Sequence, residues 1–321
     1  MQQVTAGSLT FSRLALGTMT FGDQVQREDA RLLIDTALEH GVTMIDTADV
    51  YAQGRSEQIL GELLGARRDD VVLASKVGIP PSDEVQRPLT ADAVRAGLLS
   101  SLQRLQTDHL DLYYLHQPDW RTPVEETLGA MADLVREGLV REVGVSNYPS
   151  WQISEVRALR ATSSHWPDVV VSQPQYNLLS RRLEDEYARF STRAGLVNIT
   201  YNPLAGGLLT GKYGGERDVP QHGSRFSSAQ YRERYWHSDQ FRAIERLREV
   251  AAEAGTTLPG LAFSWLLSNP LVGAVLVGAS RLEHLEDNLR CAQAPLLSAE
   301  VRAACDEVWS ALSGAAPAYS R

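Results

Sequence analysis

Cysteine is scarce in this chain, which has only Cys291 and Cys305 among its 321 residues. Two cysteines cannot form the disulfide framework that stabilises small secreted domains, so we expect a reducing, cytoplasmic setting. They are also too few for a cysteine-rich zinc site, and we expect no bound metal. No stretch approaches the roughly 18 apolar residues of a membrane span, and the first residues lack the basic and apolar regions of a signal peptide. We therefore expect neither a membrane span nor a secretory leader.

The chain has fewer basic residues than acidic residues. The chain carries 31 Lys and Arg residues against 40 Asp and Glu residues, which gives a formal net charge of −9. This balance disfavours binding to nucleic acid, but it is compatible with a local basic pocket for one phosphate. No Pro/Ser-rich linker divides the chain, so we expect one domain over residues 1–321, with a long polar loop inserted at about residues 213–238.

The chain also lacks the Gly-x-Gly-x-x-Gly sequence that a dinucleotide-binding doubly wound sheet normally carries. It has instead a repeated alternation of short apolar runs with stretches of helical periodicity. The runs predict strands at residues 13–17, 43–46, 71–76, 110–116, 141–146, 169–173, 196–201 and 274–278. The helical stretches lie at residues 27–39, 56–64, 91–105 and 239–254, and after residues 150 and 181. Eight strands buried on both faces predict an α/β fold, a (β/α)8 TIM barrel with its active site at the C-terminal face.

Polar residues follow three of these apolar runs. Asp46, Lys76 and His116 end the second, third and fourth predicted strands, and Tyr51 lies five residues beyond Asp46. Because the C-terminal ends of barrel strands meet at one face, we expect the four side chains to cluster there.

The four residue types make chemical sense together. An ordinary tyrosine has a pKa of about 10 and is a poor proton donor at neutral pH. We expect Lys76 to favour the phenolate of Tyr51, Asp46 to pair with Lys76, and His116 to orient a substrate oxygen. The reaction implied is the protonation of an alkoxide that forms when hydride reaches a carbonyl. Taken singly, each residue has a structural alternative, such as a helix cap or turn former for Asp46. We assign no role to Asp49 or Asp111, which are also acids close to strands.

Several segments of the chain resemble the aldo-keto reductase superfamily. The segment GVTMIDTADVY (41–51) resembles its first signature, while ASKV (74–77) and YLHQPD (114–119) resemble the segments that carry its lysine and histidine. The resemblance implies a catalytic tetrad of Asp46, Tyr51, Lys76 and His116. It also implies a (β/α)8 barrel that uses NADPH without a Gly-x-Gly-x-x-Gly motif.

The resemblance extends to the cofactor site. It implies that Ser146, Asn147 and Gln173 bind the nicotinamide carboxamide, that Tyr201 stacks on the ring, and that the loop up to Lys212 wraps the pyrophosphate. Ser280 and Arg281 would open a helix where a 2′-phosphate is favourable. The departures from the family pattern are Asn202, His284 and Asp287, where relatives often carry Ser, Arg or Gln, and Glu respectively. The complete set implied for the cofactor is Gly17, Thr18, Met19, Ser146, Asn147, Gln173, Tyr201, Asn202, Pro203, Leu204, Gly206, Lys212, Gly278, Ser280, Arg281, His284, Asp287 and Asn288.

Within the superfamily the sequence is most similar to the aflatoxin-aldehyde and succinic-semialdehyde reductase branch. This likeness implies arginines that receive a substrate carboxylate, for which Arg234 and Arg321 are candidates, and a homodimer. The predicted substrate residues are Met19, Trp120, Arg234, Trp236 and Arg321. Arg321 is equally compatible with a frayed terminus, Arg234 with a surface charge and Trp236 with the core.

The expected activity is NADPH-dependent reduction of aldehydes or ketones, with a small carbonyl compound as substrate. Two alternative functions stay open, because chains similar to this one resemble proteins with those functions. One is a keto-reductase of nucleotide-linked sugars in a biosynthetic pathway. The other is a cofactor-sensing regulatory subunit.

Overall fold

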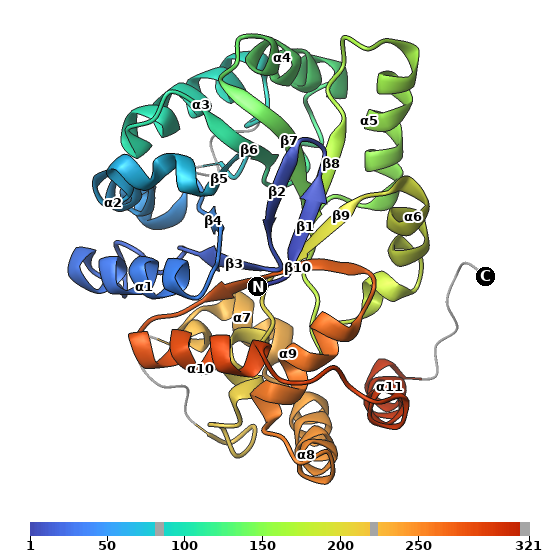
Figure 1. Ribbon diagram of the computed structural model, residues 1–321. Coiled ribbons are helices and arrows are strands. Elements are labelled where there is room, and N and C mark those ends of the chain that lie inside the picture. The colour runs from blue at the N-terminus through green and yellow to red at the C-terminus, as the bar shows by residue number, and fades with distance from the viewer. Residues whose placement is uncertain (81–86, 219–223, 315–321) are drawn as a thin grey trace.

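The computed structural model describes residues 1–80, 87–218 and 224–314. Eight parallel strands form a closed barrel in the order β10-β3-β4-β5-β6-β7-β8-β9 (Figure 1). The strands are β3 (Leu14–Gly17), β4 (Met44–Asp46), β5 (Val72–Val77), β6 (Leu110–Leu115), β7 (Val140–Ser146), β8 (Val169–Gln173), β9 (Val197–Thr200) and β10 (Val272–Gly278). The predicted (β/α)8 architecture is therefore confirmed.

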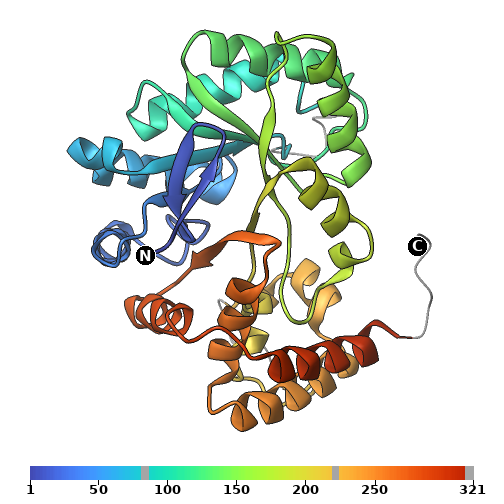
Figure 2. The same ribbon diagram turned by 45° about the vertical axis from the view of Figure 1, so that its right-hand side comes forward.

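Helices surround the barrel as an outer layer (Figure 1). They are α1 (Arg27–Glu39), α2 (Arg55–Leu64), α3 (Ala91–Leu105), α4 (Val124–Arg136), α5 (Ser150–Thr162), α6 (Tyr187–Ala194), α7 (Ala229–Tyr235), α8 (Ser238–Glu253), α9 (Leu258–Ser268), α10 (Leu282–Ala292) and α11 (Ala299–Ser313). Figure 2 shows α11 lying along α8. In the described part of the chain, no helix is long and apolar enough to cross a membrane.

Local sequence explains where α3 begins and ends. The hydroxyl of Thr90 accepts a hydrogen bond from the amide of Ala93, which satisfies a free N–H group at the helix N-terminus. At the other end Gln106 adopts a left-handed conformation, with φ of 52°, and its amide returns to the last turn. The helix therefore ends where the chain must turn toward β6.

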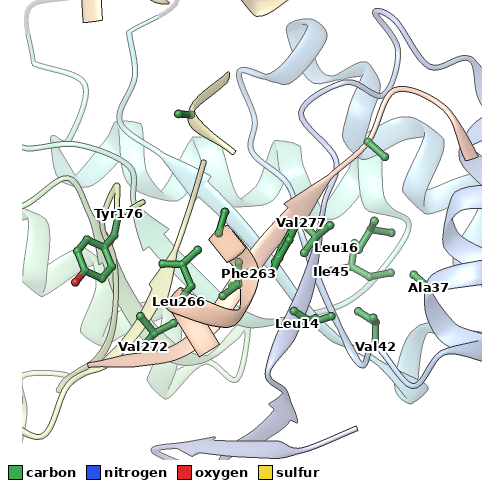
Figure 3. Packing of buried hydrophobic residues seen from close by; sticks show 14 of the residues in the cluster. Leu14, Leu16, Ala37, Val42, Ile45, Tyr176, Phe263, Leu266, Val272 and Val277 are labelled. Atoms are coloured by element: carbon green, nitrogen blue, oxygen red, sulfur yellow. The ribbon is translucent and has the colours of Figure 1, made fainter. Parts of the chain in front are cut away.

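The core has two parts because side chains alternate between the two faces of each strand. Outward-facing residues such as Leu14 and Leu16 of β3 and Ile45 of β4 belong to one buried cluster with helix residues such as Phe263 of α9 (Figure 3). Inward-facing residues fill the barrel itself; they include Met44, Ala74, Leu112, Tyr114, Val171, Ile199 and Ala274. The barrel interior is thus a packed core without room for a ligand, so a binding site is expected at the strand ends.

An antiparallel hairpin precedes the barrel and is absent from the sequence prediction. It joins β1 (Gln3–Ala6) to β2 (Leu9–Ser12) through Gly7, whose φ is 57°. Leu9 and Phe11 pack with the inward-facing residues of the barrel, and Phe11 is completely buried. The hairpin therefore covers the N-terminal end of the barrel, opposite the predicted site.

The segment between residues 213 and 238 contains more regular structure than a polar loop. The described residues form a short 3₁₀ turn (Arg225–Ser227) and α7. At the end of α7, the hydroxyl of Tyr235 accepts hydrogen bonds from Nδ2 of Asn177 (3.0 Å) and Nδ2 of Asn202 (2.9 Å). These residues follow β8 and β9, so Tyr235 fixes α7 to the face where the strands end.

Candidate active site

The predicted polar residues lie at neighbouring strand ends. Gly278 pairs with Gly17, and Gly17 pairs with Asp46, so the ends of β10, β3 and β4 lie side by side. Ser146 at the end of β7 likewise pairs with Gln173 at the end of β8. One face of the barrel therefore collects side chains that lie far apart in the sequence.

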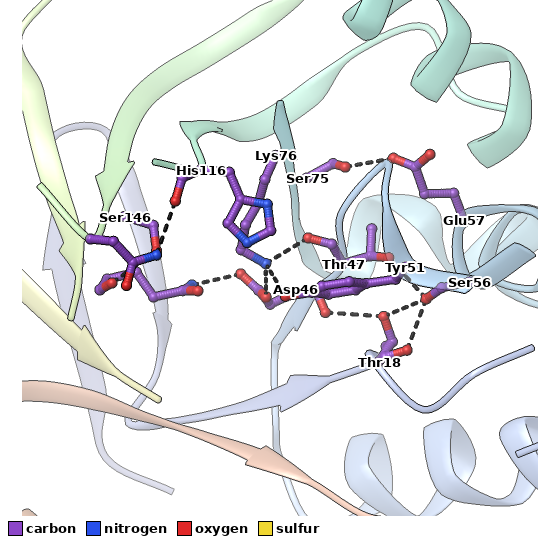
Figure 4. Close-up of polar contacts among 12 residues, drawn as sticks. Thr18, Asp46, Thr47, Tyr51, Ser56, Glu57, Ser75, Lys76, His116 and Ser146 are labelled. Atoms are coloured by element: carbon purple, nitrogen blue, oxygen red, sulfur yellow. Dashed lines mark hydrogen bonds and ion pairs between the residues drawn. The ribbon is translucent and has the colours of Figure 1, made fainter. Parts of the chain in front are cut away.

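Lys76 and Asp46 form a buried ion pair at the centre of this face (Figure 4). Nζ of Lys76 binds Oδ1 of Asp46 and donates to the carbonyl of Thr47 at 2.7 Å. Both side chains have no exposed surface. Burial alone would lower the pKa of Lys76, but the Asp46 carboxylate and the Tyr51 hydroxyl outweigh it, and the pKa is raised. Lys76 is thus held as a cation.

Tyr51 approaches the same ammonium group from a 3₁₀ turn (Tyr51–Gly54). Its hydroxyl lies 3.2 Å from Nζ of Lys76, which donates to it. Lys76 acts on the pKa of Tyr51 in the predicted direction, but it is not the largest influence. Burial of the phenol outweighs the nearby Lys76 charge, so the pKa of Tyr51 is raised above 10.0. The hydroxyl therefore keeps its proton until a reaction takes it.

His116 lies directly after β6, with its ring edge-on to the Tyr51 ring at a centroid distance of 5.9 Å. The side chain is buried, and its Nδ1 atom has no hydrogen-bond partner among the described residues. Burial, followed by the charge of Lys76, lowers the pKa of His116 well below 6.5. The imidazole is therefore neutral at physiological pH and has free hydrogen-bonding capacity.

Residues at the ends of β7, β8 and β9 form a hydrogen-bonded ledge beside this cluster. Asn147, with a left-handed φ of 60°, donates from Nδ2 to the carbonyl of His116 at 3.0 Å. Its Oδ1 accepts from the hydroxyl of Tyr201 at 2.8 Å. Ser146 donates to the backbone of Gln173 at 3.0 Å, and Gln173 donates to Oδ2 of Asp46 at 2.8 Å. The structure thus joins four predicted cofactor residues to the Asp46–Lys76 pair.

A second hydrogen-bond network, around Ser56 and Glu57 of α2, lies beside the tetrad and was not predicted from the sequence. Ser56 of α2 hydrogen-bonds the hydroxyls of Thr18 (2.8 Å) and Thr47 (2.9 Å) (Figure 4). Glu57, which is fully buried, accepts from Ser75 at 2.5 Å and pairs with Arg104 of α3 at 2.6 Å. No local signal in the sequence marks these two residues, because Ser and Glu are common in the first turn of a helix.

The chain after β9 forms a turn rich in left-handed residues. Asn202, Gly206 and Gly207 have φ values of 63°, 68° and 101°. Oδ1 of Asn202 accepts from the amide of Gly206 at 2.7 Å, which ties the turn to itself. A Cβ atom at Gly206 would lie 2.9 Å from the Tyr231 ring, so glycine is required there. Lys212 is exposed at the end of the turn.

The end of β10 and the start of α10 hold the remaining predicted cofactor residues. Arg281 is exposed and immediately precedes α10. Nδ1 of His284 lies 3.4 Å from the Ser280 hydroxyl, and Asp287 pairs with Arg290 at 2.8 Å. Across the face, the Thr20 hydroxyl donates to the carbonyl of Ala279 at 2.8 Å.

The predicted substrate residues do not all gather at one point. Met19 is 44% exposed and its sulfur accepts from Arg225 at 2.7 Å. Arg234 donates to Oε1 of Gln175 at 2.5 Å. Trp236 packs against Phe226, with a centroid distance of 4.9 Å, in an aromatic cluster under α7 and α8. Trp120 lies beside Trp151, away from this group, and Arg321 falls outside the described residues.

Arg225 is a further residue that the sequence did not single out. Its guanidinium lies 5.6 Å from the Tyr231 ring, and Arg234 lies 5.8 Å from the same ring. The charge of Arg225 is among the influences that lower the pKa of Tyr51, although burial outweighs it. Two guanidinium groups therefore lie on α7 and the turn before it, on the side of the barrel that carries Tyr51.

Comparison with known proteins finds a matching family model and several similar proteins. Residues 13–310 match a family model described as "Aldo/keto reductase family". The "Aflatoxin B1 aldehyde reductase member 2" of Rattus norvegicus is 38% identical, over 95% of this chain and 87% of the relative. The "Aldo-keto reductase family 7 member A3" of Homo sapiens is 35% identical, over 95% and 96%. A "Probable voltage-gated potassium channel subunit beta" of Oryza sativa subsp. japonica is 37% identical, over 91% of each chain.

Proposed function

The chain belongs to the aldo/keto reductase family and is an oxidoreductase that acts on carbonyl compounds; from this premise we propose that it reduces aldehydes or ketones to alcohols with NADPH, using Tyr51 as the proton donor. The observation that carries the proposal is the Tyr51 hydroxyl, 3.2 Å from the buried Lys76 ammonium and beside a neutral His116. Asp46 completes the tetrad as the partner that keeps Lys76 charged.

The protonation states of Tyr51 and Lys76 fit the role of Tyr51 as proton donor. NADPH, when bound, supplies the hydride that the carbonyl carbon accepts. As the carbonyl oxygen gains the electron pair of the C=O bond, Tyr51 transfers its proton to that oxygen and becomes a phenolate. Lys76 stabilises the phenolate by charge, and burial keeps the phenol protonated beforehand. Tyr51 regains a proton from solvent after the alcohol leaves.

His116 has the properties of an orienting group. A neutral imidazole can donate a hydrogen bond to a substrate oxygen without adding positive charge beside Lys76. Its ring lies next to that of Tyr51, so a carbonyl oxygen between them would contact both. His116 would thereby direct the carbonyl toward the proton of Tyr51.

The residues present fit a nicotinamide dinucleotide. Asn147, Gln173 and Tyr201 offer amide and aromatic groups beside the tetrad, where the carboxamide and ring would bind. The left-handed turn at Gly206 and Gly207 exposes backbone close to Lys212, which suits a pyrophosphate. Ser280 and Arg281 at the start of α10 would hold the 2′-phosphate that distinguishes NADPH from NADH.

The arginines near Tyr231 favour a substrate class. Arg225 and Arg234 place two guanidinium groups on the side of the barrel that carries Tyr51. We therefore propose aldehydes that carry a carboxylate among the substrates. The names of two relatives, which describe aldehyde reductases, support an aldehyde rather than a ketone.

A regulatory role is the second candidate, because relatives named as potassium channel beta subunits are 35–37% identical to this chain. The test for both is NADPH oxidation by the purified protein with a panel of aldehydes, including succinic semialdehyde and an uncharged aldehyde. We expect Tyr51→Phe to lose at least about 100-fold in turnover while it still binds NADPH. If the wild type were no faster than Tyr51→Phe on every aldehyde, the reductase proposal would fail and the regulatory one would take its place.

A further inference from the structure

Two exposed tryptophans lie side by side away from the tetrad. Trp120 follows β6 and Trp151 lies in the first turn of α5, and their ring centroids are 6.2 Å apart at an angle of 33°. They are 70% and 56% exposed. Single exposed apolar residues are common on protein surfaces. Two large exposed rings side by side are less common, and contiguous exposed apolar surface often marks a binding site.

The two rings border a cleft of about 360 Å³ between α4 and α5. Leu115 is part of its lining, and Leu115 packs with the outward-facing core, whereas Tyr114 beside it faces the barrel interior. The cleft therefore opens on the helix side of β6, while His116 joins the tetrad on the inner side. This cleft, which we call the tryptophan cleft, is a separate site from that of Tyr51.

The polar lining of the tryptophan cleft is acidic. It includes Asp119, Glu125 and Glu155, and among the described residues that line it there is no Lys or Arg. Asp119 is occupied in part, since it accepts from the hydroxyl and amide of Thr122. Glu125 lies in the first turn of α4, where a carboxylate also complements the helix dipole. Glu155 lies in the middle of α5, where no helix terminus explains its charge.

An unused acceptor completes the lining. Oε1 of Gln152 is buried and has no hydrogen-bond partner among the described residues. A ligand for this cleft should therefore combine positive charge, a donor or polar group for Gln152, and apolar surface for the indole rings. Cations bind well over the face of tryptophan, the best of the aromatic side chains for this purpose.

We propose that the tryptophan cleft binds a small organic cation, an alkylammonium group held by the rings of Trp120 and Trp151 and by the carboxylates of Glu125 and Glu155. This site does not depend on the reductase activity. The probe is choline, and its matched control is 3,3-dimethyl-1-butanol, which has nearly the same shape without the charge.

Calorimetric titration of the full-length protein tests the proposal. We expect choline to bind at least about tenfold more tightly than the neutral analogue, and Trp120→Leu and Trp151→Leu each to weaken choline binding by about tenfold. Glu155→Gln should weaken it as well, whereas Glu253→Gln, an exposed position on α8, should not. Circular dichroism checks that each variant is folded.

Binding should survive in Tyr51→Phe, which separates this site from the catalytic one. The proposal is overturned if choline shows no saturable binding, if the neutral analogue binds as tightly, or if both tryptophan variants bind choline like the wild type.

Discussion

Gln173 donates a hydrogen bond from Nε2 to Oδ2 of Asp46 across 2.8 Å, although 127 positions separate the two residues in the chain. Lys76 binds the other carboxylate oxygen, so Asp46 is held from both sides. Gln173 is also a predicted contact of the nicotinamide. The residues predicted to bind the nicotinamide and the proposed tetrad are therefore joined by hydrogen bonds through Asp46.

Replacing Gln173 by Glu should place a second carboxylate against Asp46 in a buried position. We expect a loss of about 3 kcal/mol in the free energy of unfolding at about pH 8, and a smaller loss at about pH 5, where the new carboxyl can protonate. Urea unfolding at the two pH values measures it. Gln103→Glu, at an exposed position of α3, is the control; equal losses in the two variants would contradict the buried contact.

Removing Lys76 should separate its chemical from its structural contribution. Lys76→Met leaves the Asp46 carboxylate buried without its ammonium, so we expect about 3–5 kcal/mol lower stability and at least about 100-fold lower turnover. NADPH affinity from a fluorescence titration should change little. Adding Asp46→Asn should recover stability and leave turnover low; recovered turnover would show that Lys76 acts only by neutralising Asp46.

Asp49 should make the protein less stable as pH rises toward neutrality. Oδ1 of Asp49 is buried without a partner among the described residues, and burial, with the charge of Glu57 next, raises the pKa of Asp49 from 3.8 to about 7. Between these values the unfolded chain releases a proton that the folded protein retains, so stability falls across that window.

Asp49→Asn should remove this dependence. We expect the free energy of unfolding of the variant to exceed that of the wild type by about 4 kcal/mol at about pH 8 and to match it at about pH 4. Unfolding by urea across this range is the measurement, with the exposed Asp69→Asn as control. Parallel stability curves for wild type and Asp49→Asn would contradict the prediction.

Titration of His116 should cause no change in kcat/KM near about pH 6.5, the ordinary pKa of histidine. Because burial, and then Lys76, hold the pKa of His116 well below 6.5, the imidazole stays neutral throughout the neutral range. Steady-state kcat/KM, measured in the Asp49→Asn background, should be flat from about pH 6 to about pH 7.5. A fall in kcat/KM below about pH 6.5 in that background would mean that His116 titrates there.

Arg281 should discriminate between the two nicotinamide cofactors. If its guanidinium holds the 2′-phosphate, Arg281→Ala should weaken NADPH binding by at least about tenfold and leave NADH nearly unchanged. Fluorescence titrations with both cofactors decide the matter. Equal weakening of NADPH and NADH would instead assign Arg281 to the adenosine or to the fold.

The barrel and its polar strand ends could be predicted because the signals are local. The predicted helices at residues 27–39 and 91–105 coincide with α1 and α3, because their amphipathic periods, and for α1 the glycine at position 41, are local features of the sequence. Lys76 could be singled out only together with Asp46, Tyr51 and His116, because each of these residues alone has a structural alternative. Family resemblance then assigned the roles that position alone left open.

Other features depend on contacts that no local pattern announces. α9 is buried on nearly every side and so has no amphipathic period to reveal it. The hydrogen bonds of Tyr235 with Asn177 and Asn202 join α7 to the loops after β8 and β9. The sequence also identifies the charge of Lys76 beside Tyr51 but not the burial of the phenol, which outweighs that charge and raises the pKa of Tyr51.

The hairpin β1–β2 covers the N-terminal end of the barrel. Leu9 and Phe11 pack in one cluster with Met44 and Tyr114, so packed side chains fill the barrel and reactants must reach Asp46 from the face where the strands end. If the nicotinamide binds against Gln173 as proposed and the substrate lies over it, the cofactor would have to bind before the substrate and leave after the alcohol.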